Sequence, residues 1–121
     1  MTVLQALDVI WIHDSCIRPP GPKMVVCIEP HLGLFFRINT KDNRQTPVKL
    51  LAREHPFLDH NSHLECGEPL ELDDYVIEQA LERKPVLGKL SRDLVAAILS
   101  AVESAKTLSQ RDKAAIRAAL A

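Results

Sequence analysis

Strand-forming and helix-forming patterns occupy different parts of this chain, and their order is what most constrains its fold. Runs of branched and apolar residues at 3–12, 23–29, 34–39 and 48–53 are separated by proline, glycine or polar turns. A strong helical pattern appears only after Ser91. Because strands and helices do not alternate, we expect an α+β fold in which a small antiparallel sheet or barrel is packed by a long helix.

Prolines and glycines mark the turns between the strands. The run at 17–22 (IRPPGP) predicts a long first loop, because consecutive prolines cannot join a strand ladder. The turn at 30–33 (PHLG) predicts that the second and third strands form a hairpin. Gly67 and Pro69 interrupt a further strand-like stretch, which indicates an edge strand or a bulge.

Helices are expected after the strands. Asp73 or Asp74 can cap a short helix. Ser91 is a good N-cap residue for a longer helix with one apolar stripe, made by Leu94, Val95, Ile98, Leu99 and Val102. Ser109 predicts the start of an extra C-terminal helix within residues 107–121.

Length and composition narrow the class of protein. With 121 residues, the chain is expected to form one domain over 1–121. No apolar run approaches the roughly 18 residues needed to cross a bilayer, so a membrane protein is not expected. The apolar N-terminus carries Asp8 and lacks the basic start of a signal peptide. Three cysteines without a CxxC spacing favour a reducing compartment, and we therefore expect a cytoplasmic protein.

Charge is segregated along the sequence, although the net charge is only −1. Between residues 18 and 53 seven bases face two acids, whereas between 54 and 103 eleven acids face four bases. A basic face on the folded protein would attract phosphate. Interleaved strands can equally mix the two charges on the surface, so both arrangements stay open.

A series of short motifs resembles the PemK/MazF/Kid toxin family. Residues 66–73 (CGEPLELD) are followed at a distance by 87–91 (LGKLS) and an apolar helix. In that family a G-[KRT]-L-[ST] turn starts the last helix. Residues 57–62 (FLDHNS) are similar to an upstream segment of the family. The resemblance spans residues 23–103, and the order of the motifs supports it more than any one of them does.

The resemblance implies an SH3-like antiparallel β-barrel with a C-terminal helix, usually as a homodimer. It also implies a metal-independent endoribonuclease that acts on single-stranded RNA without a cofactor, and an antitoxin protein as partner. Such cleavage needs a base for the 2′-hydroxyl proton, a cation for the phosphate and an acid for the leaving oxygen.

Three residues are candidates for this chemistry by their place in the family pattern. His13 lies where Kid-like members have a loop histidine, and we expect it to transfer a proton. Lys23 stands near the start of the second strand, where many members have an arginine, and would stabilise the phosphate. Thr40 ends the third strand, where MazF-like members have a hydroxyl, and would position the phosphate. The bases expected to follow the RNA backbone are Arg18, Arg37, Lys41 and Arg44.

Departures from the family pattern keep a second hypothesis open. Kid-like members flank the cysteine with Arg and Asp, whereas Glu65 and Gly67 flank Cys66 here. The same fold can then serve as a catalytically inactive interaction module that binds a protein or peptide. A solvated loop or a turn is the plain structural explanation for His13 and for Thr40.

One cluster of residues has the chemistry of metal ligands. It consists of His55, His60, His63 and Cys66, and imidazole and thiolate are the usual ligands of zinc. Their spacing is not a recognised paired set, and strand alternation would scatter the side chains, so we expect no metal site. Cys27 and Cys66 are most simply core residues.

Overall fold

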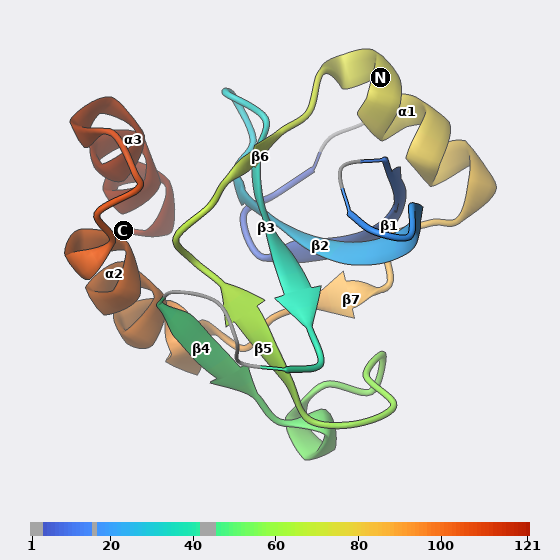
Figure 1. The fold of residues 1–121 in the computed structure, drawn as a ribbon, viewed down its shortest axis with the longest axis horizontal. Coiled ribbons are helices and arrows are strands. Elements are labelled where there is room, and N and C mark those ends of the chain that lie inside the picture. Colours follow the sequence, from blue (N-terminus) through green and yellow to red (C-terminus); the bar gives the residue numbers. More distant parts are fainter. Residues whose placement is uncertain (1–3, 16, 42–45) are drawn as a thin grey trace.

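The protein is a curled antiparallel sheet with helices on both faces (Figure 1). The computed structural model describes residues 4–15, 17–41 and 46–121. The strand order is β4-β5-β3-β2-β1-β7, and β6 also pairs with β3, so the sheet forms an open half of a barrel. Its strands are β1 Asp8–Asp14, β2 Gly21–Glu29, β3 Leu34–Asn39, β4 Pro47–Leu50, β5 Ser62–Glu65, β6 Leu70–Glu71 and β7 Gly88–Lys89. The α+β expectation is confirmed.

The predicted hairpin of the second and third strands is present as β2 and β3. Its turn contains Gly33 at φ +67°, a conformation that side chains other than glycine rarely adopt. A Cβ atom there would also clash with the carbonyl oxygen of Leu72. The far edge of β3 is shared, because β6 pairs with its first residues and β5 with its last. The predicted interruption at Gly67 and Pro69 therefore lies between β5 and β6.

The predicted first strand is wrong at both ends. Leu7 has φ +78°, and its N–H donates to the carbonyl oxygen of Cys27 at 2.6 Å, so the chain turns before it enters the sheet at Asp8. The strand then continues to Asp14. His13 consequently lies in β1 and not in the first loop.

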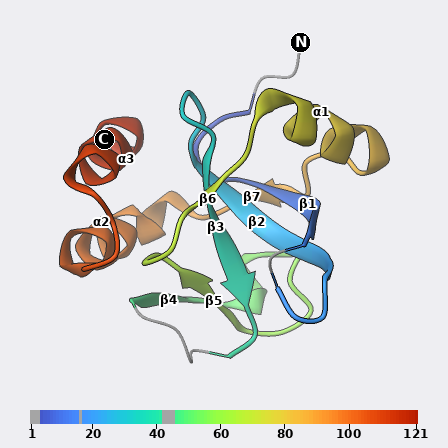
Figure 2. The same ribbon diagram turned by 45° about the horizontal axis from the view of Figure 1, so that its top comes forward.

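Two apolar clusters pack on opposite faces of the sheet. The face that contains Val26 and Phe36 is covered by α2 (Val95–Ser104) and α3 (Gln110–Leu120), which bury Ile98 and Ile116 against it (Figure 2). The other face is covered by α1 (Asp74–Arg83), whose Ile77 packs with the cluster made by Ile10, Ile12, Val25, Cys27 and Phe35. Successive strand residues serve opposite cores, as strand alternation requires.

The helix starts predicted at Asp73 and Ser109 are confirmed, whereas the longer helix α2 begins at Val95, one 3₁₀ turn later than predicted. Asp73 accepts a hydrogen bond from the Val76 N–H at 2.9 Å, and Ser109 from the Asp112 N–H at 3.1 Å. Ser91 caps a 3₁₀ turn, Arg92–Leu94, which leads directly into α2. A second 3₁₀ turn, Ala52–Glu54, follows β4 where a longer strand was expected. Within the described part of the chain, no helix has the length and apolar character that a membrane crossing requires.

Candidate functional site

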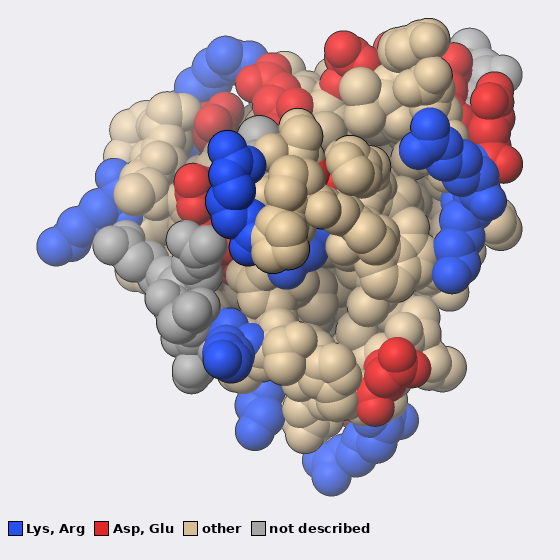
Figure 3. All heavy atoms as spheres, turned by 45° about the vertical axis from the view of Figure 1, so that its right-hand side comes forward, with Lys and Arg blue, Asp and Glu red and all other residues tan. Residues whose placement is uncertain are grey.

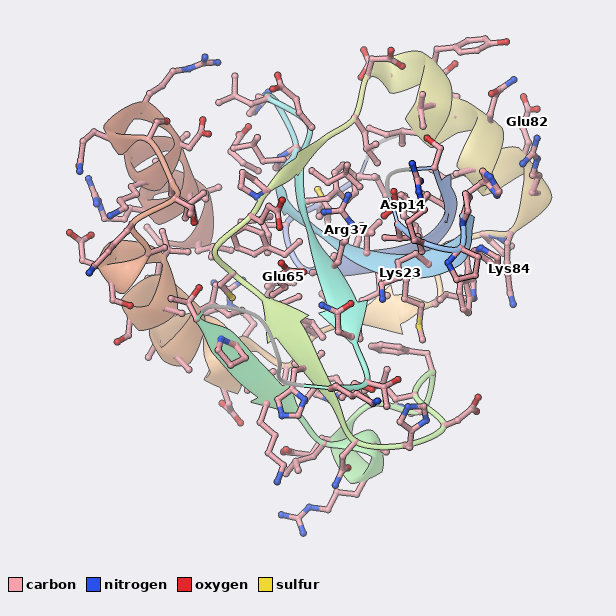
Figure 4. The ribbon with its side chains drawn as sticks, in the orientation of Figure 1. Asp14, Lys23, Arg37, Glu65, Glu82 and Lys84 are labelled. Carbon is pink, nitrogen blue, oxygen red and sulfur yellow. The ribbon has the colours of Figure 1, made fainter. Side chains whose placement is uncertain are left out.

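A charged cluster lies on the face of the sheet that α1 covers, next to the apolar cluster of that face. It consists of Asp14, Lys23, Arg37, Asn39 and Glu65, which the strand registers place on one face. The Arg37 Nε donates to Asp14 Oδ2 at 2.6 Å, and the two side chains are 11% and 2% exposed. The Asn39 Nδ2 donates to Glu65 Oε2 at 3.0 Å. Figure 4 shows Arg37 between Asp14 and Glu65, with Lys23 beside Asp14.

Electrostatics hold Arg37 in its charged form. Burial alone would lower the pKa of Arg37, but the hydrogen bond that Arg37 donates to Asp14 and the negative charges of Asp14, Glu65 and Glu68 outweigh it, and the pKa is raised. The guanidinium is therefore a fixed partner of buried carboxylates. An arginine that contacts an RNA backbone would face solvent, whereas the Arg37 side chain points to these carboxylates.

A pocket of about 480 Å³ opens at the edge of β1, and we call it the edge pocket. Its lining includes an aromatic ring, an imidazole and two exposed cations, which belong to Trp11, His13, Arg83 and Lys84. The Lys84 Nζ lies 5.5 Å from the centre of the Trp11 ring, within cation–π distance. The other lining residues are Ile12, Pro22 and Ala80. In the view of Figure 3, basic side chains lie on both sides of an uncharged surface in the middle of the molecule.

The pocket is assembled from three segments: β1, the start of β2 and the C-terminal end of α1. Trp11 and His13 project from the same face of β1, two residues apart. Arg83 ends α1 and Lys84 caps it, and cations are favoured at that end by the helix dipole. Glu82 lies on the outer side of α1, away from the sheet (Figure 4). The sequence analysis did not identify Arg83 and Lys84 as site residues. The signal in the sequence was a pair of bases directly before Pro85, where a helix ends.

The edge of β1 next to the pocket is open. β7 pairs only with Asp8 and Val9, and the Val9 carbonyl accepts from the Leu87 N–H at 2.9 Å. Main-chain polar groups of alternate strand residues point to the same side, so those of Trp11 and His13 point to this edge. Among the residues that the structure describes, no strand pairs with them there.

The three candidate catalytic residues lie in different places. His13 pairs with Pro22 across the ladder, whereas Lys23 pairs with Ile12, so their side chains project from opposite faces of the sheet. Thr40 is exposed at the end of β3, where its Oγ1 lies 3.0 Å from His60 Nε2. His13 alone of the three lines the edge pocket.

The expected RNA-backbone residues are also dispersed. The Arg18 Nη1 donates to the carbonyl oxygens of Ser15 and Ile17, each at 3.2 Å, so this guanidinium folds onto its own loop. Lys41 is exposed after β3, and Arg37 belongs to the charged cluster. Arg44 lies outside the described residues.

The residues considered as zinc ligands have other positions. His55 is buried, its Nδ1 lies 2.8 Å from the Leu51 carbonyl oxygen, and its Nε2 accepts from the Ser91 N–H at 3.3 Å. Burial raises the pKa of the Cys66 thiol to about 12, with a smaller effect from Glu65, so a thiolate is disfavoured. No group of three or more potential ligands gathers within the described ranges.

Comparison with known proteins assigns no family. No protein-family model matches the chain, and no curated protein matches it either.

Proposed function

We propose that this chain is a PemK/MazF-like domain on an SH3-like barrel, and that it binds and cleaves single-stranded RNA at the edge pocket without a metal ion. The observation that carries this proposal is the gathering of His13, Arg83 and Lys84 around Trp11. Two cations attract a phosphate, and an indole offers the stacking surface that single-stranded nucleic acid uses.

The edge pocket holds the groups that 2′-hydroxyl attack on a phosphate needs. His13 is exposed there and can accept the 2′-hydroxyl proton. The bond from the 2′-oxygen to phosphorus forms as the bond from phosphorus to the 5′-oxygen breaks. The imidazolium formed on His13 then protonates the leaving 5′-oxygen, and Arg83 and Lys84 stabilise the extra negative charge on the phosphate. The products are a cyclic phosphate and a 5′-hydroxyl.

The remaining expectations have less structural support. Lys23 and Thr40 do not line the edge pocket, so proton transfer and charge stabilisation pass in this proposal to His13, Arg83 and Lys84. Lys41 is exposed and can still hold the RNA backbone outside the pocket. A homodimer and an antitoxin protein remain expectations of the family resemblance.

Cleavage is tested on the purified protein with a mixed single-stranded RNA in EDTA. We expect discrete fragments that end in a cyclic phosphate, and we expect His13→Ala to abolish them, since removing the proton acceptor costs about 10²–10⁴-fold in rate. His31→Ala is the matched control, because His31 is an exposed histidine outside the edge pocket. Intact RNA at high protein concentration would overturn the nuclease assignment.

The second candidate is an interaction module on the same fold. Two observations favour it. Arg37 forms an ion pair with Asp14, and the side chains of His13 and Lys23 project from opposite faces of the sheet. An extended peptide can pair with an exposed strand edge, which the end of β1 provides. Intact RNA together with an absence of RNA binding would select this candidate.

A further inference from the structure

We propose that the open edge of β1 reads the Watson–Crick edge of an unpaired base through its main chain, while Arg83 and Lys84 hold the adjoining phosphate. This inference rests on the proposed binding of RNA at the edge pocket. It assigns the preference for single-stranded RNA to the backbone groups of Trp11 and His13.

The orientation of these groups follows from the hydrogen bonds earlier in the strand. The carbonyl oxygens of Leu7 and Val9 accept from the N–H groups of Leu90 and Leu87, at 3.0 and 2.9 Å. The Val9 bond leaves β1 on the side away from β2, and the carbonyl of Leu7, the residue just before β1, points to the same side. Trp11 and His13 follow Val9 at intervals of two residues, so their N–H and C=O groups point to the same side of the strand as those of Val9. The pairing with β7 has already ended there.

The exposed main chain offers what an unpaired base can use. Each outward-facing strand residue presents one N–H donor and one C=O acceptor side by side. Every RNA base has a donor next to an acceptor on its Watson–Crick edge, and unpaired bases are recognised through these edges. In a duplex the pairing base occupies the same groups. Binding to this edge therefore requires the base to be unpaired.

The surroundings of the edge favour a nucleotide over a peptide strand. The open stretch holds Trp11 and His13 and ends with the strand at Asp14, which is short for a stable peptide ladder. The C-terminal end of α1 closes over it and contributes Ala80, Arg83 and Lys84 to the pocket wall. A base, a sugar and a phosphate together use the main-chain edge, the indole and the two cations, whereas an uncharged peptide would leave the cations without a role.

The test compares two substitutions at one position. His13→Ala removes the imidazole and keeps the main-chain N–H, whereas His13→Pro removes both. Proline is tolerated on an edge strand whose N–H faces outward, and thermal unfolding checks that each variant folds. The probes are a short oligouridine and the same oligomer built from N3-methyluridine, whose N3-methyl group blocks the Watson–Crick edge. Both probes carry 2′-O-methyl groups, so the proposed cleavage cannot consume them. Binding is followed by the fluorescence of Trp11, the only tryptophan in the chain.

We expect the unmodified protein and His13→Ala to bind oligouridine about tenfold more tightly than the methylated oligomer, because a recognised hydrogen bond is lost. We expect His13→Pro to bring this ratio close to one. Equal ratios in the two variants, with RNA still bound, would overturn the inference and leave the proposed function intact. If His13→Pro does not fold, equal affinity of His13→Ala for both oligomers overturns it. Failure of the unmodified protein to bind either oligomer would refute the proposed function itself.

Discussion

The ion pair between Asp14 and Arg37 shows how strongly single residues depend on their surroundings. Arg37 was expected to contact RNA because its sequence neighbourhood is basic, yet its partners in space are Asp14, Glu65 and Glu68. These acids come from other strands and from the chain between β5 and β6. Sequence gives the charge of a strand residue, but its ion-pair partner depends on strand register.

At this scale we predict that Asp14→Ala lowers the free energy of unfolding by about 3–5 kcal/mol, because it removes the hydrogen-bonded partner of a largely buried guanidinium. Urea unfolding monitored by circular dichroism measures the loss. The control is Glu103→Ala, which breaks the Arg117–Glu103 pair at 2.8 Å, whose side chains are 48% and 63% exposed. That substitution should cost less than about 1 kcal/mol. Similar losses for the two variants would contradict the structural role of Asp14.

Local chemistry explains which elements could be predicted. The caps Asp73, Ser91 and Ser109 act within three residues of the helix or turn that they start, so their signals are visible in the sequence. β7 was missed because two residues carry no periodicity, and its pairing partner β1 lies far away in the chain. The start of β1 was misplaced because Leu7 turns the chain at a positive φ that no sequence signal marks.

The β2–β3 hairpin gives the prediction at the element scale. Gly33→Ala should cost about 1–3 kcal/mol from the positive φ alone, and the clash with the Leu72 carbonyl oxygen adds to this loss. Gly21→Ala is the matched control, because an added Cβ at Gly21 meets no atom within 4 Å. Thermal unfolding of the two variants compares them. A stability loss for Gly33→Ala no larger than that for Gly21→Ala would show that the turn is not constrained as described.

For the whole molecule, the fold class and most elements were predictable, whereas the candidate site was predictable only in part. His13 was identified as a candidate, but its neighbours Arg83 and Lys84 were not, since they reach it only when α1 packs against β1. Lys23 and Thr40 were separated from His13 by strand alternation and strand order. Sites assembled across a sheet depend on contacts between distant segments, which residue patterns do not contain.

The measurement that tests the central claim most directly is a fluorescence titration of Trp11, in EDTA, with single-stranded RNA whose 2′-oxygens are methylated so that it can bind but cannot be cleaved. Trp11 lines the edge pocket, so binding there changes its emission. We predict saturable quenching, and at least about a tenfold loss of affinity in the double variant Arg83→Gln/Lys84→Gln, since each cation neutralises phosphate charge. The control Lys106→Gln/Arg111→Gln removes two exposed bases on the α2–α3 side and should bind as the unmodified protein does. Unchanged emission, or equal affinity for the two double variants, would contradict RNA binding at the edge pocket.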